Sequence, residues 1–190
     1  MDKSSLKDSI KEVSVRLFSE KGFHATTIRE IAKESECSLP MLYYYYKSKE
    51  ELFYEVAYRE YVSLTGRLFE TLDTNGMIQD VCFDAIRQRK ELSVYDKAAF
   101  KLSMKTWLGL NGNLEVSKAL NDYVEEQMKK IKVFITGYYG NTEEGRTRCG
   151  IILRVIENMI EKIILFDEDI PEEVIKRELE VCMGFCDKKE

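Results

Sequence analysis

Four consecutive tyrosines, Tyr43 to Tyr46, stand at the end of the segment SLPMLYYYY at residues 38–46. In a helix, Leu42 and Tyr46 would share one face because they lie one turn apart. The opposite face would carry Leu39, Pro40, Tyr43 and Tyr44. Such an apolar and phenolic face is costly in water unless a partner covers it. The major groove of double-stranded DNA can cover it, because thymine methyl groups take apolar contacts and phosphate oxygens accept hydrogen bonds from tyrosine hydroxyls.

Ordinary packing is the alternative explanation for this tyrosine run. For Tyr46 we favour packing, because it shares the inward face with Leu42. For Tyr43 and Tyr44 we favour contact with DNA, because of the motif in which they stand.

Two short helices are expected to position this face. Thr27 and Glu30 have the spacing of a capping box, which marks the start of the first of these two short helices. A tight turn at Glu36 separates it from the second helix, for which Ser38 is a typical N-cap. Residues 27–46 therefore have the outline of a helix-turn-helix.

The rest of the chain also has helical periodicity. Apolar residues recur at three- and four-residue spacing, and only two prolines interrupt the 190 residues. We expect an all-α fold of about nine helices, with a first helix that ends at Lys21-Gly22. Further helices are expected near residues 49–72, 77–90, 94–110, 114–138, 150–166 and 172–185, with a cap signal at Asn141. We predict a three-helix DNA-binding domain at residues 1–48 and a second helical domain at residues 49–190.

The charge distribution gives little support to nucleic-acid binding by itself. The chain has a net charge of −5, and residues 1–53 contain equal numbers of acidic and basic residues. Any contact with DNA must therefore come from local placement of side chains. The apolar runs are short and the first residues have no apolar signal region, so we expect a cytoplasmic protein with no membrane partner.

Catalytic and metal-binding residues are sparse. The chain has one histidine, His24, and five scattered cysteines (Cys37, Cys82, Cys149, Cys182 and Cys186). No closed set of zinc ligands and no Ser/His or Cys/His nucleophile set is recognisable. We therefore expect no metal, no cofactor and no enzymatic activity.

The segment LFSEKGFHATTIREIAKESECSLPMLYYYYKSKEELF at residues 17–53 resembles the N-terminal signature of tetracycline-repressor (TetR/AcrR) family transcriptional regulators. The resemblance covers residues 10–53, and beyond them only length and helical architecture match. It implies a helix-turn-helix domain followed by a ligand-binding and dimerisation domain. It also implies contacts with DNA from Thr27, Ser38, Leu39, Pro40, Tyr43, Tyr44 and Lys49.

Two positions depart from the family pattern. Glu36 and Pro40 stand where the family often has glycine or another small residue. The second helix also offers no Arg, Lys, Asn or Gln for bidentate contacts with bases, each of which contributes about 1–3 kcal/mol of discrimination. We therefore expect contact with thymine methyl groups and shape readout of an AT-rich site.

The resemblance further implies an effector cavity in the second domain. The aromatic and sulfur-containing residues of the middle helices could line it or could be plain core. As ligand contacts we select Tyr61, Phe100, Met104, Trp107 and Tyr123, which favour a hydrophobic small-molecule effector.

The last two helices carry broad apolar stripes. The resemblance implies that they form a four-helix bundle across a two-fold axis. The residues assigned to this interface are Ile152, Val155, Ile156, Met159, Ile163, Val174 and Leu179. The alternative is that both stripes simply cover the core of one subunit.

The sequence thus predicts a homodimeric repressor that a small molecule releases from a pseudo-palindromic operator. The alternative is an adaptor or co-activator of the same fold that acts through protein partners without specific DNA binding. The neutral first domain and Glu36 leave this alternative open.

Overall fold

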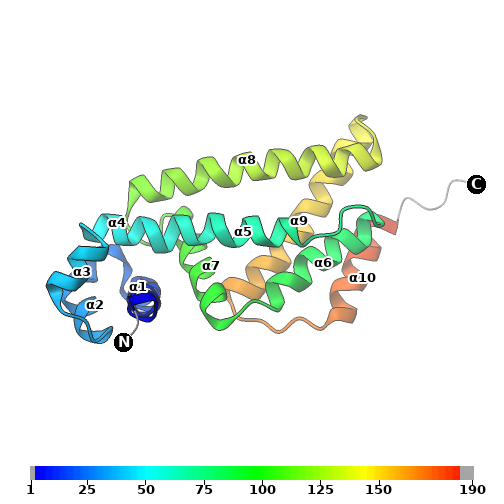
Figure 1. Cartoon of the computed structure of the whole chain (residues 1–190). Coiled ribbons are helices and arrows are strands. Elements are labelled where there is room, and N and C mark those ends of the chain that lie inside the picture. The colour runs from blue at the N-terminus through cyan, green and yellow to red at the C-terminus, as the bar shows by residue number, and fades with distance from the viewer. Residues whose placement is uncertain (1–2, 185–190) are drawn as a thin grey trace, which may run out of the picture. The chain divides into compact units, whose positions relative to one another are not determined.

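The computed structural model describes residues 3–184, which form helices and no strand (Figure 1). The all-α prediction is confirmed. The helices are α1 (Lys3–Ala25), α2 (Ile28–Glu34), α3 (Leu39–Tyr45), α4 (Lys49–Tyr54), the π-helical η1 (Glu55–Arg59), α5 (Glu60–Glu70), α6 (Ile78–Lys90), α7 (Val94–Trp107), α8 (Leu114–Tyr139), α9 (Glu143–Leu165) and α10 (Glu172–Met183). Because α4, η1 and α5 follow one another without a break, these residues make nine continuous helices, as expected.

The chain divides into two compact units. The first comprises the residues up to Gly66 together with Ser93–Tyr123, and the second comprises Arg67–Leu92 together with the residues from Val124 onward. This division differs from the predicted boundary at residue 48. The reason is that α1 packs against α4, η1 and α7 as well as against α2.

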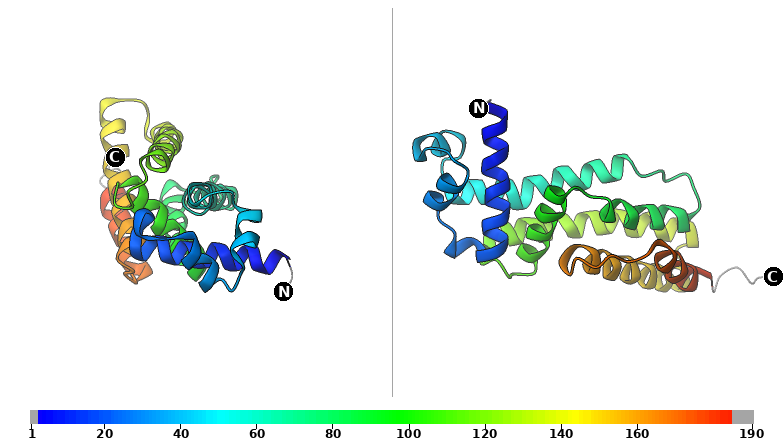
Figure 2. Two further views of the ribbon diagram at one scale, coloured as in Figure 1. Left: turned by 90° about the vertical axis from the view of Figure 1, so that its left-hand side faces the viewer. Right: turned by 90° about the horizontal axis from the view of Figure 1, so that it is seen from below.

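Aromatic packing holds the first unit together around α1. The rings of Phe18 and Phe53 meet edge-on with centroids 4.9 Å apart, and Phe23 lies 5.0 Å from Phe53. Helix α2 packs against α1, and α3 packs against α2 (Figure 2, right). The sequence predicts that the first helix ends at Lys21-Gly22; the backbone leaves helical geometry at Gly22 with a φ of 78°, but α1 continues beyond this kink to Ala25.

The helical run over residues 49–70 contains a feature that its periodicity does not predict. The five residues of η1 are wound as a π-helix, a form that is uncommon and often marks a functional position. The carbonyl of Ala57 in this segment accepts a hydrogen bond of 2.7 Å from the hydroxyl of Ser103 on α7. A tertiary contact therefore satisfies a backbone group of the π-helix.

In the second unit, α6, α9 and α10 pack against one another. The core that these three helices share contradicts part of the predicted dimer interface. Four residues of the predicted interface are buried in this core, so they cannot form a surface for a second subunit: Ile152, Met159, Ile163 and Leu179. Val155, Ile156 and Val174 are half-buried.

The N-cap of α9 lies one residue after the predicted position, because Thr142, and not Asn141, accepts the hydrogen bond from Gly145.

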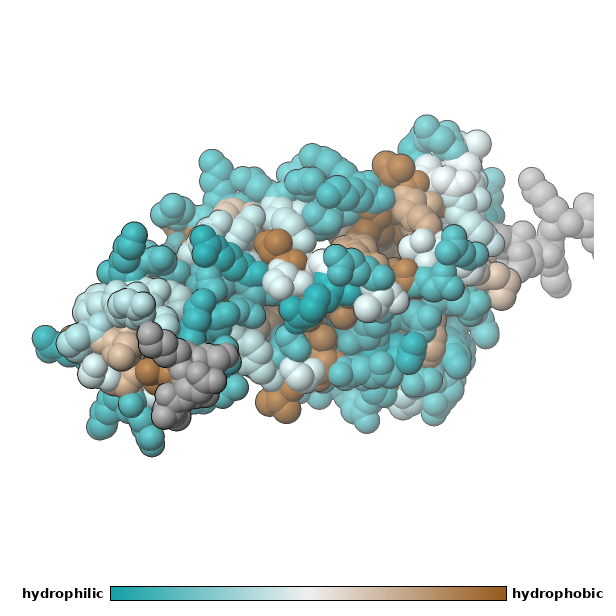
Figure 3. All heavy atoms as spheres, viewed as in Figure 1, coloured by the Kyte–Doolittle hydropathy of each residue, from teal (hydrophilic) through white to brown (hydrophobic). Residues whose placement is uncertain are grey.

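Most of the surface in Figure 3 is hydrophilic, with separate apolar patches. Between residues 3 and 184, no helix is both long enough and apolar enough to cross a membrane. Cys186 lies outside the described residues, and the four other cysteines are free thiols.

Candidate nucleic-acid interface

Serine and threonine caps fix the start of each short helix in this region. The hydroxyl of Thr27 accepts from the Glu30 amide at 3.2 Å, and that of Ser38 accepts from the Met41 amide at 3.3 Å. Both predicted caps are confirmed. In the turn between the helices Glu36 adopts a φ of 53°, a left-handed conformation that glycine adopts more easily.

Helix α3 turns two faces in opposite directions, as its sequence predicts. Leu42 is fully buried and Tyr46 is 3% exposed, whereas Tyr43 is 47% exposed and Tyr44 is 72% exposed. Pro40 is also exposed and Leu39 is half-buried. We call Leu39, Pro40, Tyr43 and Tyr44 the α3 face. Sequence reasoning missed Met41, which is exposed beside them.

The predicted phosphate contact Lys49 has an internal role in the structure. Its ammonium group donates to the carbonyls of Phe23 and Thr26, at 2.9 and 3.1 Å. It also lies 4.3 Å from the centroid of the Phe23 ring. Two of its three N–H donors are thereby used within the chain. Contact of Lys49 with phosphate stays a prediction.

Ion pairs neutralise part of the charge around α2. Lys21 bonds Glu30 and Arg16 bonds Glu34. The hydrogen bond to Glu30 raises the pKa of Lys21, and the same bond lowers the pKa of Glu30. Arg29 and Lys33 on α2, and Lys47 just after α3, are exposed cations. Sequence reasoning did not select them, because nothing in their spacing separates them from an ordinary solvated surface.

Four of the five predicted ligand residues converge in the first unit, around the ring of Tyr61. The ring of Tyr61 lies 5.0 Å from that of Phe100, 5.6 Å from Trp107 and 5.9 Å from Tyr123, measured between centroids. The hydroxyl of Tyr123 pairs with the Thr65 hydroxyl at 2.8 Å. Met104, from the same face of α7, is buried. We call Tyr61, Phe100, Met104, Trp107 and Tyr123 the aromatic cluster.

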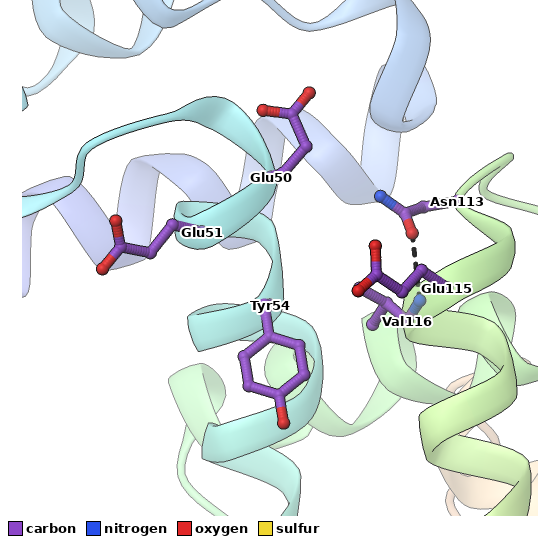
Figure 4. A pocket seen from close by; sticks show the side chains of 6 residues that line it. All are labelled: Glu50, Glu51, Tyr54, Asn113, Glu115 and Val116. Atoms are coloured by element: carbon purple, nitrogen blue, oxygen red, sulfur yellow. Dashed lines mark hydrogen bonds between the residues drawn. The ribbon is translucent and has the colours of Figure 1, made fainter.

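A cavity of about 300 Å³ lies elsewhere in the same unit (Figure 4). Its lining residues come from α4, from the start of α8 and from the residue just before α8: Glu50, Glu51, Tyr54, Asn113, Glu115 and Val116. Three carboxylates make its wall acidic, and it shares no residue with the aromatic cluster. Asn113 accepts from the Val116 amide at 3.0 Å and so caps α8.

Comparison with known proteins agrees with this geometry. Residues 10–56 match the family model described as bacterial regulatory proteins, tetR family. The chain is 50% identical over 52 residues to the transcriptional regulator QacR of Staphylococcus aureus, a match that covers 27% of this chain and 28% of that protein. It is 31% identical over 110 residues to the transcriptional repressor KstR2 of Mycolicibacterium smegmatis, covering 53% of each. The matches thus span about half or less of these relatives' length.

Solved structures resemble almost the whole chain. A TerR/AcrR-family regulator from Aquifex aeolicus superposes with a TM-score of 0.68 at 20% identity, over 95% of this chain and 98% of that one. FadR of Bacillus subtilis, solved in complex with stearoyl-CoA, gives 0.67 at 15% identity, over 94% and 98%. At this identity the likeness shows the fold alone.

The fold and the capped α2–α3 pair define a helix-turn-helix protein. Residues 10–56 are similar to the matching segment of the tetR family of bacterial regulatory proteins, and the chain shares its fold with solved regulators such as that of Aquifex aeolicus.

Proposed function

We propose that this chain is a transcriptional repressor that binds an operator as a homodimer and is released by a hydrophobic small molecule. The observation that carries the proposal is the α3 face, where the fold exposes two tyrosines on a capped helix whose other face is buried. Repression, as opposed to activation, is supported by relatives such as KstR2, which is named a transcriptional repressor.

The chemistry of the α3 face sets the expected operator. Its apolar groups suit thymine methyls, and its two exposed hydroxyls suit phosphate oxygens. Selection of binding sites from a random duplex pool tests this. We expect an AT-rich, pseudo-palindromic site with half-sites about 34–36 Å apart, the spacing of successive major grooves. Enrichment of G·C-rich sites, or of none, would contradict the proposal.

The aromatic cluster is the proposed effector site. Its members are buried or half-buried and mostly apolar, and FadR of Bacillus subtilis, whose solved structure has a similar fold, is in complex with stearoyl-CoA. Trp107 is the chain's single tryptophan, so its emission reports on the cluster directly. Stearoyl-CoA serves as a first probe. Release of the operator at concentrations that change Trp107 emission supports the site, and release with unchanged emission places the effector elsewhere.

A homodimer would place two α3 faces on successive grooves. Because four of the predicted interface residues are core, the proposed interface uses the outer sides of α9 and α10. Ile151 and Val181 are exposed there, next to the half-buried Val155 and Val174. Residues 151 and 155, and residues 174 and 181, are one and two helical turns apart, so each pair shares a face.

A further inference from the structure

The turn between α1 and α2 rests on a loop that is distant in sequence. The amide of Phe23 donates to the carbonyl of Asn111 at 3.1 Å. The Nε2 atom of His24 lies 2.8 Å from the carbonyl oxygen of Gly112, to which it donates. Both acceptors belong to the segment between α7 and α8, residues 108–113. We call this segment the seat, and we call residues 22–27, which run from the kink of α1 at Gly22 to the N-cap of α2, the turn.

The seat is itself firmly attached to α7. The side-chain amide of Asn111 is buried and donates to the Leu102 carbonyl and the Thr106 hydroxyl, at 3.3 and 3.0 Å. The position of the seat therefore follows the last turns of α7. Helix α7 supplies three members of the aromatic cluster, and the last of them, Trp107, directly precedes the seat.

The turn also determines where α2 begins. Thr27, the N-cap of α2, is the last residue of the turn. Lys49 fastens the same turn from the side of α4 through the carbonyls of Phe23 and Thr26. The hydrogen bonds from the seat and from Lys49 thus fix the direction in which the chain enters the helix-turn-helix.

Close contact between His24 and Gly112 makes the arrangement specific. A Cβ atom at residue 112 would lie 2.7 Å from Cδ2 of the His24 ring, and the φ of Gly112 is 76°. Only glycine brings its carbonyl this close to the imidazole without displacing the ring.

We propose that His24 is a positioning residue for DNA binding, which holds the α1–α2 turn on the seat and so sets the angle at which α2 and α3 meet the groove. The proposal rests on the proposed function. A helix-turn-helix that is already held at the productive angle loses less conformational freedom when it binds DNA.

Two glycines of the seat provide a matched test. Gly109 has a φ of 78°, like Gly112, but a Cβ there would meet nothing within 4 Å. G109A and G112A therefore share the backbone strain, and only G112A displaces His24. We expect G112A to weaken binding to the selected operator roughly three- to ten-fold more than G109A. We also expect faster amide hydrogen exchange at Phe23 in G112A alone.

Exposed His24 gives a second pair of variants that keep the fold. H24A should weaken operator binding roughly two- to ten-fold, and H24Q, which retains an N–H donor near the Nε2 position, should recover most of it. In an H24A background G112A should behave like G109A. Equal effects of G109A and G112A on both operator affinity and Phe23 exchange would overturn the inference. Failure of the wild-type chain to bind any selected duplex would instead overturn the proposed function.

Discussion

Tyr44 and Tyr46 have the same side chain, but they lie in opposite environments. Tyr44 lies within α3 and is exposed to solvent, whereas Tyr46, the extended residue that caps the end of α3, is buried in the core. The sequence predicts this difference because Leu42 fixes the inward direction of α3. Burial raises the pKa of Tyr46, with further contributions from Glu55 and Glu60, so its hydroxyl stays neutral.

The buried hydroxyl of Tyr46 has no hydrogen-bond partner among the described residues. Y46F should therefore leave the free energy of unfolding unchanged or raise it by up to about 1 kcal/mol. Y123F is the matched control, since the Tyr123 hydroxyl pairs with Thr65, and its loss should cost about 1 kcal/mol. Urea denaturation measures both values. A loss of stability in Y46F as large as in Y123F would show that the hydroxyl is satisfied.

Lys49 shows that a residue pattern is insufficient to predict a tertiary hydrogen bond. The family pattern marks it as a phosphate contact, but its bonds to the α1–α2 turn depend on tertiary packing that no local spacing encodes. K49M should lower the free energy of unfolding by roughly 1–3 kcal/mol, because two charge-assisted hydrogen bonds are lost. K47M, at an exposed position nearby, should change it by less than about 0.5 kcal/mol. Equal stabilities of the two variants in thermal unfolding would contradict the internal role of Lys49.

At the scale of elements, the sequence predicts the helix starts well and the π-helical segment not at all. The caps Thr27, Ser38 and Ser48 depend on residues three positions ahead, so their patterns are local. The π-helix at residues 55–59 packs against α7 and accepts a hydrogen bond from Ser103, about 46 residues away. No periodicity within residues 49–72 contains that information.

The bond between Ser103 and η1 is testable. S103A should leave the buried Ala57 carbonyl without this donor and lower the free energy of unfolding by roughly 1–3 kcal/mol. S19A is the control, because the buried Ser19 hydroxyl has no hydrogen-bond partner within residues 3–184 and its removal should cost nothing. The comparison is made by chemical denaturation at one pH. An S103A variant as stable as S19A would mean that the π-helix does not need the bond.

At the scale of the whole molecule, the broad apolar stripes of α9 and α10 predict a buried surface but not what buries it. The structure assigns the centres of both stripes to the core of the second unit. The sequence could not make this distinction, because a stripe that covers a core and a stripe that covers a partner have the same spacing.

The proposed interface predicts which substitutions separate the subunits. The double variant I151E/V181E should sediment as a monomer at concentrations where the wild-type chain is a dimer, because it places charge on the outer sides of α9 and α10. M77E is the matched control, since Met77 is exposed outside both helices. Analytical ultracentrifugation distinguishes the species. A dimer that survives I151E/V181E would place the interface elsewhere.

The most direct test concerns the α3 face and DNA. Fluorescence anisotropy compares the wild-type chain with Y43A/Y44A on the selected operator and on a scrambled duplex of the same length, over a series of salt concentrations. We expect the wild-type chain to prefer the operator and to bind more weakly as salt rises. We expect Y43A/Y44A to lose roughly ten-fold or more in affinity for the operator, with unchanged thermal stability, because both side chains are exposed. A double variant that keeps the full preference for the operator would contradict the account.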